Sequence, residues 1–139
     1  MNPVLIFWPM IAVVFVPIAV LFLNAIRKAH QRKSGSIHPD APIDNRAWSM
    51  PVLLTSNSLA NQFQLPVLFY VLAFILFNIN GVSALSLSLA WVFATSRWVH
   101  AFVHVTSNNI PLRLSFFGIG AIALLLLFVV TIIQLMSLS

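Results

Sequence analysis

Four long apolar runs, separated by shorter polar segments, constrain what this chain can fold into more than any other feature. They cover residues 3–25, 53–78, 82–106 and 112–136. A helix of about 20 apolar residues spans a hydrocarbon core roughly 30 Å thick. Only 6% of the 139 residues are charged, whereas soluble domains carry roughly a quarter. The sequence therefore predicts an all-α integral membrane protein, a four-helix bundle forming a single domain over residues 1–139.

The polar segment after the first apolar run carries most of the positive charge. Five of the seven Lys and Arg residues lie within residues 27–46, and the net charge is +5. By the positive-inside rule, this segment predicts a cytoplasmic loop over residues 26–50, with both termini outside. In a membrane protein, such an excess indicates topology and contact with anionic lipids, and no nucleic-acid partner is expected. The loop is expected either to be a structured connection or to cover a cytoplasmic-side site, with Asp40 or Asp44 supplying an acid.

An arginine and two histidines interrupt the third apolar run. A charge at the bilayer centre costs about 2.5–3.5 kcal/mol, so Arg97 requires a partner or a function. At about 100° per residue, His104 falls about 20° from Arg97 around a helix, and His100 about 60° away. The three residues therefore predict one polar stripe. Arg113 lies at the same end, in the first turn of the last predicted helix.

A second polar stripe is expected in the second apolar run. Asn57, Asn61 and Gln64 fall within about 60° of one another on a continuous helix, and Pro66 should kink that helix just beyond them. Because lipid supplies no hydrogen-bond partners, both stripes are expected to face the bundle interior. The chain has no glutamate, so the two arginines lack a neighbouring counter-charge. This arrangement predicts a cytoplasmic-side pocket that favours an anion.

Structural roles remain open for each of these residues. Arg97 could donate only to Asn61, Gln64 or helix-end carbonyls, and the Asn/Gln stripe could serve only to join helices. The two histidines lack a third ligand, so no metal site is predicted and interhelical hydrogen bonding is favoured. Arg113 could bind a lipid phosphate. The chain contains no cysteine, so any thiol chemistry would require a thiol from a ligand.

The spacing Arg97-x-x-His100-x-x-x-His104, followed by Arg113 behind a proline, resembles the MAPEG superfamily, the membrane-associated proteins in eicosanoid and glutathione metabolism. The segment 57–70 is similar to the second-helix motif of bacterial members. The resemblance implies a homotrimer in the bacterial inner membrane, with glutathione bound between subunits towards the cytoplasm. It implies that the glutathione site is lined by Asn57, Asn61, Gln64, Arg97, His100 and His104.

The resemblance further implies a glutathione transferase or peroxidase that acts on lipophilic electrophiles. Arg113 matches the arginine proposed to stabilise the glutathione thiolate, since a nearby cation lowers a thiol pKa from about 8.5 towards neutrality. The chain departs from the enzymes at three positions. Gln64 stands where they usually carry Glu, His104 where they carry Tyr, and Asn57 where Arg is frequent. The lost carboxylate leaves an alternative open: a non-catalytic membrane protein that binds a phospholipid or another anion, or supports a partner protein.

Overall fold

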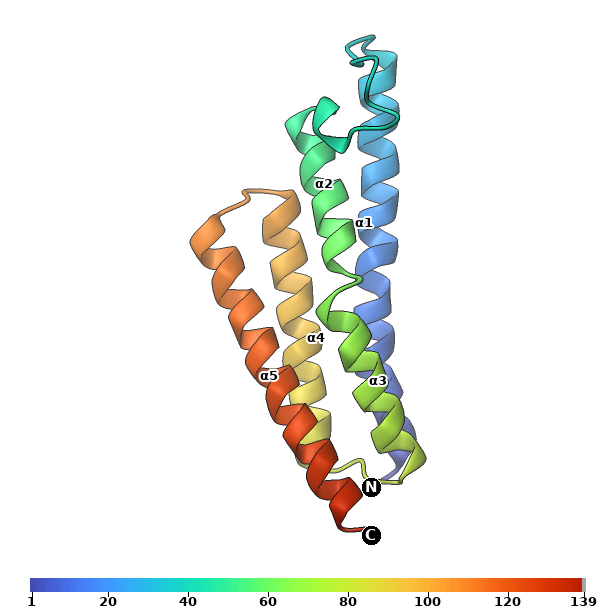
Figure 1. Cartoon of the computed structure of the whole chain (residues 1–139), viewed down its shortest axis with the longest axis vertical. Coiled ribbons are helices and arrows are strands. Elements are labelled where there is room, and N and C mark those ends of the chain that lie inside the picture. The colour runs from blue at the N-terminus through green and yellow to red at the C-terminus, as the bar shows by residue number, and fades with distance from the viewer. Residues whose placement is uncertain (139) are drawn as a thin grey trace.

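The chain forms long helices packed side by side. The structure is a computed structural model that describes residues 1–138. Its elements are η1 (Pro3–Ile6), α1 (Phe7–Lys33), η2 (Asn45–Ala47), α2 (Met50–Asn61), α3 (Leu65–Asn78), α4 (Ala84–Val105) and α5 (Ile110–Met136). Figure 1 shows both termini at one end and the loop between α1 and α2 at the other, with α3 continuing the path of α2. The predicted all-α bundle is confirmed over the described residues.

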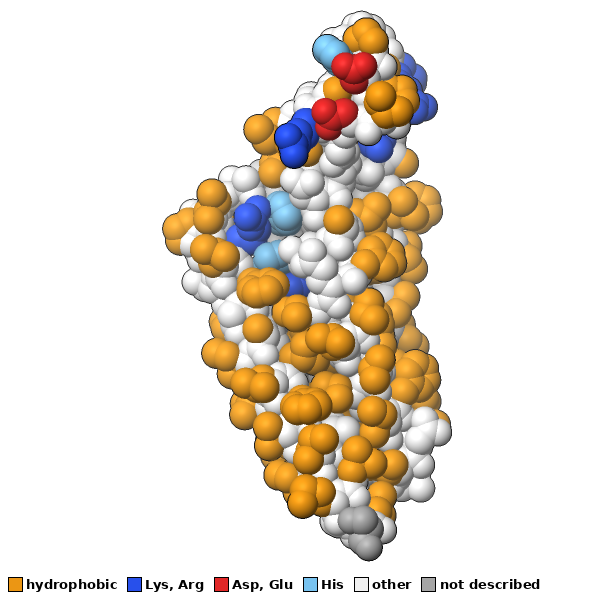
Figure 2. Space-filling model, in the orientation of Figure 1, with side chains coloured by type: hydrophobic (Ala, Val, Ile, Leu, Met, Phe, Trp, Pro, Cys, Tyr) orange, Lys and Arg blue, Asp and Glu red, His pale blue; other side chains and the backbone are white. Residues whose placement is uncertain are grey.

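Three helical segments are long and apolar enough to cross a membrane by length and composition: Pro3–Lys33, Met50–Asn78 and Ile110–Met136. Large apolar side chains are exposed on all of them, and they cover most of the surface seen in Figure 2. In α4, by contrast, the polar side chains of Arg97 and His100 are buried while Trp98 and Phe102 are exposed. Polar groups inside and apolar groups outside are what a lipid environment favours.

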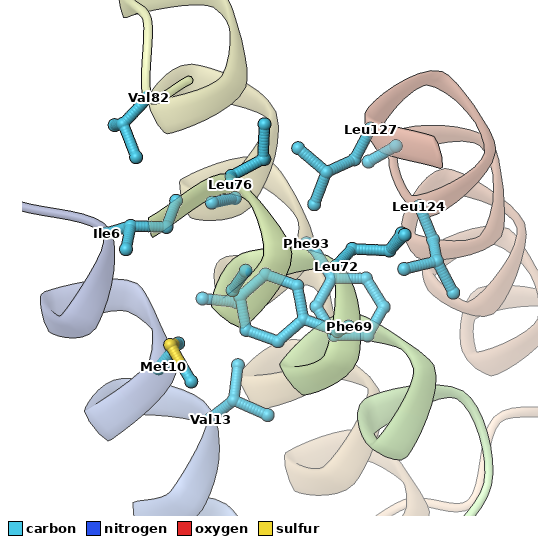
Figure 3. Packing of buried hydrophobic residues seen from close by; sticks show 14 residues of the cluster. Ile6, Met10, Val13, Phe69, Leu72, Leu76, Val82, Phe93, Leu124 and Leu127 are labelled. Carbon is cyan, nitrogen blue, oxygen red and sulfur yellow. The ribbon is translucent and has the colours of Figure 1, made fainter. Parts of the chain in front are cut away.

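An apolar core joins α1, α3, α4 and α5 near the chain termini. Figure 3 shows side chains from these helices converging, and the cluster includes Ile6, Met10, Val13, Phe69, Leu72, Leu76, Phe93, Leu124 and Leu127. Phe69 and Phe93 stack with their ring centroids 4.6 Å apart. Helix α4 packs chiefly against α5 and α1, and α3 packs against α5. The polar half of α4 therefore extends from an apolar half that is packed into the core.

Small residues allow α4 and α5 to approach closely. A Cβ atom added at Gly120 of α5 would lie 2.5 Å from the Ser96 Oγ of α4. The same addition at Gly118 would meet no atom within 4 Å. The small residues at four-residue spacing in the first half of α4, Ser86, Ala90 and Ala94, are all buried. The close approach of α4 and α5 therefore requires that residue 120 have no side chain.

The Gly120→Val variant is expected to be destabilised by about 1–3 kcal/mol, the range typical of overpacking. Gly118→Val introduces the same side chain into the same helix and is expected to stay within about 0.5 kcal/mol of the parent. Thermal unfolding of both variants in one detergent measures the difference. Equal melting temperatures for the two variants would show that the close approach does not limit the packing of α4 against α5.

The second predicted helix is broken rather than kinked. A single helix over residues 53–78 was expected, but α2 ends at Asn61 and α3 begins at Leu65. Pro66 lies in the first turn of α3, where its missing N–H leaves no intrahelical bond unmade. The chain between the helices turns through residues 62–64.

Helix α1 continues to Lys33, beyond the expected end near residue 25. The extension carries Arg27, whose Nη1 donates to the Pro51 carbonyl at 2.8 Å and whose Nη2 donates to the Val105 carbonyl at 2.8 Å. Val105 is the last residue of α4, and a carbonyl at a helix C-terminus has no partner within its own helix. Arg27 therefore ties the start of α2 and the end of α4 to α1.

The loop over residues 34–49 folds back onto α1 and α2. Trp48 donates from Nε1 to the Ala41 carbonyl at 2.8 Å and packs with Ala41 and Val52. Gln31 of α1 accepts from the Ser49 backbone N–H at 3.1 Å and from Ser49 Oγ at 2.7 Å. These contacts are those of a structured connection, the first of the two expected alternatives.

The two acids of the chain are engaged within this loop. Asp40 lies 3.5 Å from His38 Nδ1, and Asp44 accepts from the Arg46 N–H at 2.9 Å. In Figure 1 the loop lies beyond the end of α2, away from α4 and α5. Within the single chain, neither carboxylate lies over the arginines of α4 and α5.

Candidate functional site

Arg97 is the largest fully buried side chain among the described residues, with 1% of its surface exposed. Its Nη2 donates to Asn61 Oδ1 at 2.7 Å, which joins α4 to the last residue of α2. Its Nε and Nη1 are buried without a hydrogen-bond partner. A buried donor without a partner costs about 1–3 kcal/mol, and more when it is charged. The guanidinium group is therefore held in place by one contact and has donors left for a ligand.

The two histidines lie one turn apart on the same buried side of α4. His100 Nδ1 lies 3.0 Å from the carbonyl oxygen of Arg113. Because a carbonyl only accepts, this Nδ1 carries the proton, and in the neutral ring Nε2 is an acceptor. That Nε2 and the Nδ1 of His104 are buried without partners. The histidine rings meet edge to face with centroids 5.8 Å apart.

Arg113 is placed by the turn between α4 and α5. Asn108 has a φ of 48°, a left-handed conformation that Asn tolerates better than most residues. Its N–H donates to the Val103 carbonyl at 2.8 Å, and its Oδ1 accepts from Arg113 Nη1 at 2.7 Å. Asn109 caps α5, its Oδ1 accepting from the Leu112 N–H at 3.0 Å. The guanidinium of Arg113 is thus half-buried at the rim of the site.

Only one member of the predicted Asn/Gln stripe contacts the arginine. Asn61 bonds to Arg97, whereas Asn57 and Gln64 are exposed on the single chain. The structure corrects the expectation that the whole stripe faces the interior of one bundle. Asn57 lies on the outer side of α2, and Gln64, which helical rotation places about 20° from Asn57, is exposed on the same side.

Two buried polar residues at this end of α2 were not predicted as part of the site. Ser58 and Gln62 are both buried, and neither Ser58 Oγ nor Gln62 Oε1 has a partner. The buried side of α2 runs through Val52, Thr55, Ser58 and Gln62. The three- and four-residue spacing of these positions is the sequence signal that identifies them.

The site contains positive charge without a neighbouring acid. Among residues 1–138 the only acids are Asp40 and Asp44, and both make their contacts within the loop. Within the same residues, no three His, Cys, Asp or Glu side chains are grouped as a metal site. Figure 2 shows Lys or Arg and His side chains together over the ends of α4 and α5 nearest the loop. Buried donors with no local counter-charge favour binding of an anionic group.

The comparisons with known proteins agree with the helical pattern. The model of the MAPEG family matches residues 5–133, which include α1 to α4, most of α5 and each residue of the site. No curated protein and no solved structure matches the chain.

Proposed function

Because this chain belongs to the MAPEG family, we propose that it is a membrane glutathione transferase or peroxidase acting on lipophilic electrophiles. Members of the family are membrane proteins that commonly use glutathione. The observation that carries the proposal is Arg97, a buried guanidinium with two unpartnered nitrogens and no acid beside it. Glutathione carries two carboxylates, and charge-assisted hydrogen bonds to a carboxylate are among the strongest that a guanidinium makes.

Arg113 is the residue that we propose to activate the thiol. When bound, glutathione supplies the sulfur nucleophile that this cysteine-free chain lacks. A guanidinium beside the sulfur stabilises the thiolate and lowers the thiol pKa. Arg113 is positioned for this role, since Asn108 binds its Nη1 and His100 binds its carbonyl. The remaining donors of the guanidinium are free to face a ligand at the rim.

A lipophilic substrate could reach α4 from the membrane. A cavity of about 150 Å³ lies between α1 and α4, and its lining is apolar, including Val16, Val20, Leu23, Trp98, Phe102 and Val105. It lies along the same half of α4 as the candidate site. Apolar lining of this kind suits the hydrocarbon part of an electrophile that partitions into the bilayer.

The proposal includes a single domain over residues 1–139 that forms homotrimers in the bacterial inner membrane. The site would then lie between subunits on the cytoplasmic side, with both termini outside and the basic residues 27–46 in the cytoplasm. The exposed Asn57 and Gln64 support this arrangement, because polar side chains on the outer face of a membrane helix require a partner. In a trimer, Asn57 and Gln64 would reach the site of a neighbouring subunit. They would complete that site, which already contains the neighbour's own His104.

Calorimetric titration of the detergent-purified protein with glutathione tests the proposal. Binding in the millimolar range or tighter is expected, and Arg113→Ala is expected to weaken it about tenfold, since one charge-assisted contact is lost. Arg46→Ala removes an exposed arginine in the loop and should leave the affinity unchanged. The absence of both a heat signal and a thermal shift at saturating glutathione would exclude this function.

A second function is favoured by the lack of an acid at the site. The amine of glutathione has no neighbouring carboxylate within the chain, because Asp40 and Asp44 both lie in the loop away from the arginines of α4 and α5. A non-catalytic protein whose arginines bind the phosphate of a phospholipid or another anion needs no such acid. Lipid that co-purifies and is not displaced by glutathione would support this second function, and its complete displacement by glutathione would argue against it.

A further inference from the structure

The apolar cavity between α1 and α4 ends beside a positive charge. Its volume is about 150 Å³, and its lining includes Ala19 and Leu23 of α1 and Ala101 and Val105 of α4. Arg27 follows Leu23 by four residues, a spacing that places two side chains next to each other on a helix. Arg27 Nη2 also lies 2.8 Å from the carbonyl oxygen of Val105. The guanidinium group therefore lies at the end of the cavity nearest the basic loop.

The charge of Arg27 has no counter-charge in the fold. Its Nη1 and Nη2 donate to two neutral backbone carbonyls, those of Pro51 and Val105. A guanidinium group has five N–H donors, and the side chain is partly exposed, so further donors face outwards. Both acids of residues 1–138 make their contacts within the loop. A basic side chain next to the membrane surface, without an acid beside it, favours an anionic headgroup over a zwitterionic one.

The rest of the cavity suits a hydrocarbon chain. Trp98 lines the end farthest from Arg27, and α1 holds it in place. Its Nε1 donates to the Ala12 carbonyl at 2.8 Å, and its ring stacks on Phe15 with the centroids 5.7 Å apart. The seven residues from Trp98 to Val105 span about 10 Å of helix. An apolar cavity of this volume is about the size that binds benzene, so it accommodates part of an acyl chain.

We propose that this groove binds one anionic phospholipid, with its phosphate at Arg27 and part of one acyl chain in the cavity between α1 and α4. Arg27 lies just beyond the apolar residues 3–25, where the hydrocarbon core gives way to headgroups. A bilayer phospholipid supplies the negative charge and the chain in one molecule, whereas free phosphate would occupy only the guanidinium.

This lipid site is separate from the arginines of α4 and α5 and requires no glutathione, so it goes beyond the proposed function. A lipophilic substrate that enters the same cavity would have to displace the acyl chain.

Native mass spectrometry of the delipidated protein, titrated with phosphatidylglycerol and phosphatidylethanolamine of equal chain length, tests the phosphate contact. The wild type is expected to bind one phosphatidylglycerol about fivefold more tightly, the effect of about one basic side chain near a membrane surface. Arg27→Met should bind the two lipids equally. Lys33→Met, which removes an exposed charge from the same helix, should keep the preference. The wild-type comparison holds even if Arg27→Met fails to fold.

Filling the cavity tests the acyl-chain contact. Ala19→Phe is expected to weaken binding of both lipids at least tenfold, a change that the loss of about two buried methylene groups is enough to cause. Ala25→Phe adds the same side chain at an exposed position of α1 outside the cavity lining and should bind lipid as the wild type does. Glycerophosphoglycerol, the headgroup without chains, should not displace the bound lipid at equal concentration.

Four outcomes would overturn the proposal. The first is equal affinity of the wild type for the two lipids. The second is a preference lost in Arg113→Met and kept in Arg27→Met, which would place the headgroup at the other arginine. The third is several weakly bound lipids without one preferred complex, which would be a general lipid coat. The fourth is a protein that binds no lipid and whose number of subunits changes in Ala19→Phe, because a second copy then covers the groove.

None of these measurements involves glutathione, whose binding is titrated separately. The failure of the lipid site and the failure of the proposed function are therefore distinguishable.

Discussion

Replacing Arg97 with methionine is expected to reduce glutathione affinity at least 100-fold while changing the melting temperature little. The loss of affinity follows from removing two charge-assisted donors, each worth about 1.5–3 kcal/mol. The small effect on stability follows from the contacts of Arg97 in the fold. One hydrogen bond to Asn61 is lost, but a buried charge with two unpartnered nitrogens is removed as well, and methionine fills much of the same space.

The double variant Arg97→Met/Asn61→Leu sharpens this prediction. The single variant leaves Asn61 Oδ1 without its donor, whereas replacing both partners with apolar side chains is close to neutral or stabilising in general. The double variant is therefore expected to melt at or above the temperature of the wild type. Arg46→Met, which removes an exposed arginine, is the control for the change in net charge. A double variant that unfolds well below the wild type would show that Arg97 is chiefly structural.

Replacing Arg113 with alanine is expected to slow conjugation of glutathione to a lipophilic electrophile about 100-fold at neutral pH. Removing one group that stabilises developing charge typically lowers turnover by 100- to 1,000-fold. The loss should shrink as the pH is raised, because the thiol then ionises without help from the guanidinium. Arg113→Lys keeps the positive charge and should restore part of the rate. Initial rates measured over a range of pH separate this effect from a loss of fold.

The helical fold could be predicted because its signals are local. Each apolar run is long enough for a membrane helix, and Asn109 with Pro111 marks the start of α5 in sequence as in structure. Helix ends were harder to place. The polar composition after Ala25 predicts a loop, but α1 continues to Lys33 because Arg27 and Gln31 find partners in distant segments. Arg27 and Val105 are 78 residues apart in sequence, and no local pattern reveals such a contact.

The candidate site could be predicted on α4 and only in part on α2. Arg97, His100 and His104 share one buried side because α4 is continuous, so simple helical rotation places them together. On the second run the predicted stripe was assigned to the wrong side of the helix, because Asn57 is exposed within α2 itself while Val52, Thr55 and Ser58 are buried. A proline can kink a helix or start a new one, and Pro66 does the latter. Gln62 lies four residues after Ser58 and continues the buried side of α2, whereas Gln64 falls on the exposed side that Asn57 shares.

The most direct test of the account is the ultraviolet absorbance of the thiolate when glutathione is added to the purified protein at neutral pH. The account predicts a thiolate signal that saturates with glutathione, is absent with S-methylglutathione, and disappears in Arg113→Ala. In Arg97→Met the signal should appear only at much higher glutathione concentrations, because this variant weakens binding of the peptide. Saturated binding of glutathione without any thiolate signal in the wild type would contradict the proposed role of Arg113 and the enzymatic function with it.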